Sequence, residues 1–222
     1  MSKKEIHVII FLVEGDTEVE FYGKVRQLLL QQYSNNKYEF LKPINIKGIG
    51  NYKSNASRQF ANEKDKFLKS KALKNNRKQK KSEEIENNVK FVFHAFMCID
   101  NDVLDSTTKP AKFRQNPPIN EEETKKSIEA KNGIPHFIKA VQCIEDWFLE
   151  DKNGIIKYLK LSKMPKLDNN KSGADNLKFV FSKGHKLYTK GTKSVGFIDC
   201  LNISMILQNH SDNFQELINL IQ

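Results

Sequence analysis

Acidic residues follow each of three strongly apolar segments in this sequence of 222 residues. The segments are Ile6–Val13, Asn88–Ile99 and His136–Ile144. The acids that follow them are Glu14, Asp100, Asp102, Glu145 and Asp146. In an open parallel sheet, ligands bind outside the carboxyl ends of the strands, so neighbouring strands of this kind would bring their carboxylates together. We therefore expect an acidic site at one edge of a sheet.

Such a site requires cations. Carboxylates that lie close together repel one another unless protons or cations neutralise them, and the hard divalent cations Mg²⁺ and Mn²⁺ favour oxygen ligands. Residues i and i+2 at the end of a strand point to the same side, so Asp100 and Asp102 can hold one ion or bridge two. A divalent cation held by acids beside a basic surface is suited to phosphoryl transfer on nucleic acid.

Each acidic motif also has a purely structural interpretation. Asp100-Asn101-Asp102 is a good turn sequence. Acids such as Glu14 and Asp16 are common near helix N-termini, where they interact favourably with the helix dipole. The shared position of these motifs at the ends of successive strands is what favours a functional site.

The spacing of apolar residues predicts alternating strands and helices. Ile6–Val13 is a continuous run rich in β-branched residues, typical of a strand buried on both faces. A helix is expected over Val19–Leu30, with Thr17 as its cap, and then a strand at Tyr38–Ile46 that Pro43 interrupts. A β-α-β-α-β order implies a parallel, doubly wound sheet with right-handed crossovers. The later segments are expected to be a loop at Leu104–Asn120 and helices at Glu121–Lys131, Ile155–Leu161, Ala174–Phe181, Val195–Leu207 and Asn213–Ile221.

The same pattern predicts the domain organisation. Residues 1–151 are expected to form one α/β domain with a parallel sheet, flanking helices and a basic insert at about 69–87. Beyond it the apolar spacing becomes helical, so residues 152–222 are expected to form a helical extension packed on that domain.

The charge of the chain points to an anionic partner. Lys and Arg number 37 against 27 Asp and Glu, a formal net charge of +10. The segment Lys69–Lys81 contains seven of the basic residues and no acid, and such a run can follow a phosphate backbone. A solvated helix end, or a genome that favours Lys and Asn codons, would explain the same composition. The expected nucleic-acid-binding residues are Lys69, Lys71, Lys74, Arg77, Lys78, Lys80 and Lys81.

Other features exclude several classes of protein. No apolar run approaches the roughly 18 residues that cross a bilayer, and the N-terminal residues lack the features of a signal peptide. Three scattered cysteines exclude a disulfide framework and argue against a structural zinc site. We expect a soluble, cytoplasmic protein with no membrane partner.

Two stretches of the sequence resemble the TOPRIM domain. They are Val13–Val25 (VEGDTEVEFYGKV) and Phe96–Val103 (FMCIDNDV). The domain is shared by topoisomerases, bacterial primases and nucleases of the overcoming-lysogenization-defect class. Its pattern is a Glu after the first strand and Asp-x-Asp after a later strand, which Glu14, Asp100 and Asp102 match.

A third stretch is similar to small bacterial TOPRIM proteins of the phage-defence type. These carry a Glu-x-Trp-Phe/Leu-Leu element after the last sheet strand, which Cys143–Asp151 (CIEDWFLED) matches with Glu145 as its acid. The similarity covers residues 6–25 and 92–150, and 186–222 loosely. The lysine-rich insert and the Pro-rich loop after Asp102 match no part of the family pattern.

The resemblance implies a Rossmann-like TOPRIM fold and a Mg²⁺- or Mn²⁺-dependent nuclease that hydrolyses DNA or RNA. It also implies a role in anti-phage defence, with activity restrained by a partner ATPase. Glu14 would be the general base or a metal ligand, Asp100 and Asp102 would bind the metal, and Glu145 would be a further ligand. Lys190 and Lys193 would stabilise the developing negative charge, and His185 is a less favoured proton donor. Topoisomerase and primase activities are not expected, since both need further domains.

Two other functions remain open. The first is a non-catalytic TOPRIM-like module that binds nucleic acid or a partner protein, with a metal of purely structural importance. The second is a phosphoryl-receiver domain, which normally has an acidic pair after its first strand; here Gly15 follows Glu14. His94 and His136 lie in apolar strands and are expected to be core residues.

Overall fold

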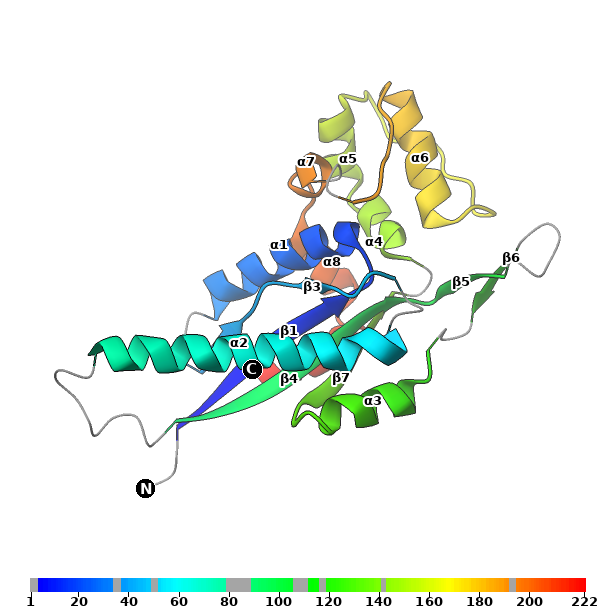
Figure 1. Ribbon diagram of the computed structural model, residues 1–222. Coiled ribbons are helices and arrows are strands. Elements are labelled where there is room, and N and C mark those ends of the chain that lie inside the picture. Colours follow the sequence, from blue (N-terminus) through cyan, green and yellow to red (C-terminus); the bar gives the residue numbers. More distant parts are fainter. Residues whose placement is uncertain are drawn as a thin grey trace.

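The protein is built around a parallel sheet of five strands in the order β2-β1-β4-β7, with β3 also paired to β1 (Figure 1). The computed structural model describes residues 4–33, 37–48, 52–78, 89–105, 112–115, 119–140, 143–191 and 195–222. The strands of the sheet are β1 (Lys4–Val13), β2 (Tyr38–Phe40), β3 (Ile44–Asn45), β4 (Val89–Asp100) and β7 (Ile134–Ala140). The predicted α/β, Rossmann-like fold class is confirmed.

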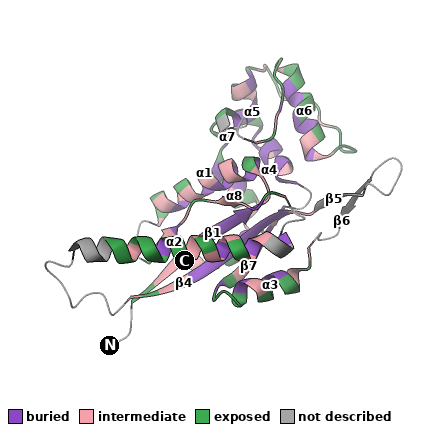
Figure 2. Ribbon diagram, in the orientation of Figure 1, coloured by how far each residue is buried: buried purple, intermediate pink, exposed green. Residues whose placement is uncertain are grey.

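Helices cover both faces of the sheet because its central strands are apolar on both sides. Along β1, Ile9 and Phe11 belong to one core cluster, whereas Val8 and Ile10 belong to the other. The first cluster includes side chains of α1 (Asp16–Gln32), and the second includes those of α2 (Tyr52–Lys78) and α3 (Glu121–Glu129). Figure 2 shows the buried strands between partly exposed helices. Burial on both faces explains why the strand sequences do not alternate between apolar and polar residues.

The helices of the C-terminal part share the first core. Ile155, Leu177, Phe197 and Phe214 are buried in the same cluster as Phe11 of β1. The division of the chain into two parts at residue 151 stays a prediction. One apolar core contains residues from both sides of that position. These helices are α4 (Ile144–Glu150), α5 (Lys152–Leu159), α6 (Gly173–Lys183), α7 (Val195–Ile198), α8 (Ile203–Asn209) and α9 (Gln215–Ile221). Within the described ranges, no helix has the length and apolar character that crossing a membrane requires.

Several predicted element boundaries were wrong. Pro43 lies between β2 and β3, which replace the single strand expected there. The expected loop contains an antiparallel pair, β5 (Asp102–Asp105) with β6 (Lys112–Gln115); these strands are too short for their pattern to be recognised. The helix expected over Val195–Leu207 is two helices, because the side chain of Asn202 caps α8 and accepts a hydrogen bond from the Met205 amide at 3.1 Å.

The basic insert is partly helical. Helix α2 has 27 residues and continues through Lys78, so residues 69–78 of the expected insert belong to it. Residues 79–87, with Lys80 and Lys81, lie outside the described residues.

A row of three histidines crosses the sheet. His94 Nε2 lies 2.9 Å from His7 Nδ1, and His94 Nδ1 lies 3.0 Å from His136 Nε2. His136 Nδ1 in turn lies 2.6 Å from an oxygen of Glu216 on α9. His94 is 3% exposed, as expected of a core histidine. The row therefore connects three adjacent strands to the helix that covers them.

Candidate functional site

Glu14 and Asp100 meet at the carboxyl edge of the sheet. Glu14 follows β1 and Asp100 is the last residue of β4; the register of these parallel neighbours pairs Val13 with Cys98. The Asp100 amide donates a hydrogen bond of 2.9 Å to Glu14 Oε1. The Ile144 amide, at the start of α4, donates one of 3.0 Å to Asp100 Oδ1. The backbone thus fixes the Glu14 carboxylate against the Asp100 amide, and the Asp100 carboxylate against the N-terminus of α4.

Tyr52 holds together the two strands that deliver these acids. Its hydroxyl lies 2.8 Å from the Leu12 carbonyl oxygen and 2.7 Å from that of Cys98. Both carbonyls lie two residues before an acid of the site, and Tyr52 is fully buried at the start of α2. Sequence patterns do not identify this residue, because only the tertiary fold brings it to the strand ends.

Removing this hydroxyl should destabilise the fold. We expect Tyr52→Phe to lower the free energy of unfolding by about 1–3 kcal/mol, because two buried carbonyls lose a hydrogen-bond donor. Urea denaturation at neutral pH measures this. Tyr158→Phe, in a half-buried ring on α5, is the matched control and should cost less than about 0.5 kcal/mol. Equal losses in the two variants would contradict the strand-holding role.

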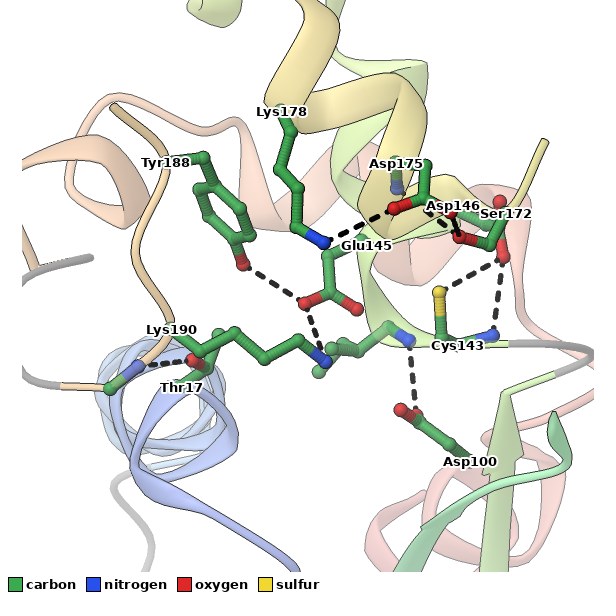
Figure 3. A network of polar contacts seen from close by, with 12 residues as sticks. Thr17, Asp100, Cys143, Glu145, Asp146, Ser172, Asp175, Lys178, Tyr188 and Lys190 are labelled. Atoms are coloured by element: carbon green, nitrogen blue, oxygen red, sulfur yellow. Dashed lines mark hydrogen bonds and ion pairs between the residues drawn. The ribbon is translucent and has the colours of Figure 1, made fainter. Parts of the chain in front are cut away.

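Glu145 is part of the same region, but it does not end a strand as predicted. Strand β7 ends at Ala140, and Glu145 lies in the first turn of α4, fully buried. Its Oε1 accepts a hydrogen bond of 3.0 Å from the Tyr188 hydroxyl and lies 2.9 Å from Lys190 Nζ (Figure 3). Its Oε2 has no hydrogen-bond partner among the residues that the structure describes.

Asp146, the other acid of this pair, has a structural role. Its carboxylate accepts a hydrogen bond of 3.2 Å from the Cys143 amide, which closes the N-terminus of α4 (Figure 3). Of the two neighbouring acids, Asp146 therefore caps the helix, whereas Glu145 has a fully buried carboxylate oxygen without a hydrogen-bond partner among the described residues.

Glu18 is a further acid that the sequence interpretation missed. It lies one helical turn after Glu14 on α1 and is 9% exposed. Burial raises the pKa of its carboxyl above the ordinary value. The spacing of four residues from Glu14 was the available signal, because it places both acids on one side of a helix start. A pocket at this edge is lined by Glu14, Glu18, Tyr22, Cys98, Ile99, Asp100, Ala140, Ile144 and Trp147.

The expectation that Thr17 caps α1 was wrong. The N-cap is Gly15, and Thr17 lies within the helix. Its hydroxyl oxygen instead accepts a hydrogen bond of 2.7 Å from the Gly191 amide (Figure 3). This bond ties a C-terminal segment to α1 beside the acids.

Lys190 brings a positive charge to the acids. Burial lowers the pKa of its ammonium, but the charge of Glu145 and the contact with it outweigh burial and raise the pKa above its ordinary value. Asp100 and Glu18 act in the same direction. The Lys190 side chain is 54% exposed, so solvent weakens this ion pair.

The described structure does not place the remaining predicted site residues at the acidic edge. The backbone of Asp102 begins β5, but its side chain lies outside the described residues, as does Lys193. His185 is exposed just beyond the C-terminus of α6.

The described part of the basic run, residues 69–78, lies at the other end of the sheet from the acids. Helix α2 begins beside the acidic edge at Tyr52 and runs back along the sheet, so its C-terminal end is far from the carboxyl end of β4 (Figure 1). At 1.5 Å per residue, Lys69 lies roughly 25 Å along the helix from Tyr52. Lys71 pairs with Glu39 and lies 5.0 Å from the Phe67 ring centre. Lys69 is exposed, whereas the side chains of Lys74, Arg77 and Lys78 lie outside the description.

The chemistry of the donors fits a hard divalent cation. Glu14, Asp100 and Glu145 offer carboxylate oxygens, which Mg²⁺ and Mn²⁺ favour; Glu145 Oε2 has no hydrogen-bond partner within the described ranges. In the part of the chain that the structure describes, no group of three or more His, Cys, Asp or Glu residues is arranged so that it could hold a metal ion.

No protein-family model, curated protein or solved structure matches this chain. The resemblance to the TOPRIM domain therefore depends on its motifs, two of which supply acids to one edge of the sheet.

Proposed function

We propose that the protein is a nuclease of the TOPRIM type, dependent on Mg²⁺ or Mn²⁺, that hydrolyses phosphodiester bonds of DNA or RNA. The observation that carries this proposal is the contact between Glu14 and Asp100 at the carboxyl edge of a parallel sheet. The buried Glu145 supports it, because this residue follows Ile144, which contacts Asp100, and has one oxygen that is unpartnered among the described residues. Carboxylates gathered in this way are suited to holding a cation.

The acids and Lys190 have complementary roles in this proposal. Glu14 and Asp100 would hold the cation, with Glu145 as a further oxygen donor. When bound, the cation supplies an activated water and Lewis-acid stabilisation of the phosphoryl oxygens. Glu14 would also accept the proton of the attacking water, and the ammonium of Lys190 would stabilise the negative charge that develops on the phosphate.

The basic part of α2 would contact the nucleic acid away from the cleavage point. Because its basic end is far from the acids, it would hold a distant part of a long substrate rather than the scissile phosphate. This separation also favours a second candidate function, a non-catalytic module that binds nucleic acid or a partner protein. As an effector in anti-phage defence, the nuclease would be restrained by a partner ATPase, since free activity would damage the host.

A cleavage assay tests the proposal. We expect the purified protein, with or without a candidate ATPase partner, to cut plasmid DNA or total RNA in Mg²⁺ or Mn²⁺. Cleavage should stop when EDTA removes the metal. Gel electrophoresis of both substrates over time measures this. Binding without cleavage under every metal and partner condition would favour the non-catalytic module.

A further inference from the structure

A short C-terminal segment lies against the acidic edge and is attached on two sides. This segment, Leu187–Gly191, is called the Lys190 strap. On one side, the Gly191 amide donates a hydrogen bond of 2.7 Å to the Thr17 hydroxyl of α1. On the other, Tyr188 and Lys190 both contact Glu145 of α4 (Figure 3). Gly191 has a φ of 91°, so the chain turns here through a conformation that favours glycine.

Both contacts from the strap to Glu145 are made to the same carboxylate oxygen. The Tyr188 hydroxyl at 3.0 Å and Lys190 Nζ at 2.9 Å both contact Oε1, whereas Oε2 has no hydrogen-bond partner in the described part of the chain. A fully buried carboxylate requires a counter-charge, and here Lys190 provides it. The acid therefore retains an oxygen that could bind a second cation.

Lys190 contacts one of the carboxylates that would also bind the divalent cation. Its Nζ lies 2.9 Å from Oε1 of the buried Glu145, whose neighbour Ile144 donates its amide hydrogen to Asp100 Oδ1 at 3.0 Å. Two cations that share a small group of partly buried carboxylates repel each other, and this repulsion is stronger near a protein interior than in water. Each cation should therefore weaken the binding of the other.

We propose that Lys190 is an internal counter-cation of the acidic site, and that its ion pair with Glu145 opposes the binding of the divalent cation. This inference rests on the proposed function, because it requires the cation site at Glu14 and Asp100. Coupling between two binding events is reciprocal. A bound cation should therefore loosen the Lys190 strap, and removal of Lys190 should strengthen cation binding.

Mg²⁺ titration of the full chain tests the inference. Trp147 is the single tryptophan and lines the pocket, so its fluorescence reports cation binding without any measurement of activity. At pH 8, with calorimetry as a second measurement, we expect Lys190→Met to bind Mg²⁺ about tenfold more tightly than wild type. Lys190→Arg keeps the charge and should bind like wild type. Lys186→Met is the matched control and should also be unchanged, because Lys186 contacts the Tyr158 carbonyl.

Hydrogen exchange on the wild-type protein tests the reciprocal effect and does not depend on how Lys190→Met folds. Saturating Mg²⁺ should accelerate amide exchange in the peptide that contains Gly191. Unchanged exchange, or Mg²⁺ binding by folded Lys190→Met that is equal to or weaker than wild type, overturns the competition but leaves the cation site. If neither wild type nor any variant shows saturable binding of Mg²⁺, the proposed cation site fails together with this inference.

Discussion

Glu14→Gln and Asp100→Asn should each reduce cleavage by about a hundredfold or more while leaving the fold intact. Each substitution removes one negative charge from the acidic edge, which weakens cation binding and removes a proton acceptor. The amide side chains still offer an oxygen to the hydrogen bonds from the Asp100 and Ile144 amides. Circular dichroism and urea denaturation should therefore resemble those of wild type.

The measurement is a time course of cleavage in Mg²⁺ and in Mn²⁺, with substrate binding followed separately. Glu122→Gln is the matched control, because Glu122 lies on α3 with 70% of its side chain exposed. This control should cleave at the wild-type rate. Full activity in either Glu14→Gln or Asp100→Asn would show that the acidic edge is not the catalytic site.

Acid should destabilise the protein through the histidine row. Burial, followed by the neighbouring His136 and His7, lowers the pKa of His94 from its ordinary 6.5 to about 3. Below about pH 6.5 the unfolded chain therefore binds a proton at His94 that the folded protein does not bind. The contribution of the neutral His94 to the free energy of unfolding is fully present above that pH and is lost progressively as the pH falls toward 3. Linkage predicts a loss of about 2 kcal/mol between pH 6.5 and pH 5 from this residue.

Comparison of the pH dependence in two variants isolates this effect. The variant His94→Gln lacks the titrating imidazole, so its free energy of unfolding should fall less steeply as the pH is lowered. At neutral pH its free energy of unfolding should be lower than that of wild type. His185→Asn alters an exposed histidine and should keep the wild-type slope. Urea denaturation at pH 7, 6 and 5 measures all three proteins. Parallel pH profiles for His94→Gln and wild type would contradict the buried, neutral state of His94.

The parts of the fold that the sequence predicts well are those dominated by burial. The runs that become β1 and β4 are apolar throughout because helices cover both faces of the sheet. Their parallel pairing follows from the intervening helices, and it brings Glu14 and Asp100 together.

Prediction was less successful where one apolar run contains several elements. His136–Ile144 includes most of β7 and the first residue of α4. Hydrophobicity does not change across these boundaries, so Glu145 was placed at a strand end. Its true place in a helix determines that it meets Tyr188 and Lys190.

Contacts between helices and the strand ends were harder to predict. Tyr52 is an ordinary residue of α2 until the fold places its hydroxyl beside the ends of β1 and β4. For Glu18, the spacing of four residues from Glu14 was a signal that the sequence did offer. The net charge also contained no information on where the basic run would lie. Helix α2 carries residues 69–78 of that run toward the end of the sheet opposite the acids (Figure 1).

The position of Lys190 in the chain affects when the site can form during synthesis. Glu14 and Lys190 are 190 − 14 = 176 positions apart, and Glu145 lies between them. A ribosome therefore releases β1 long before the residues that complete the acidic edge. For the proposed nuclease, an unfinished chain would lack the assembled site, so translation itself would delay the onset of activity until residue 190 has emerged.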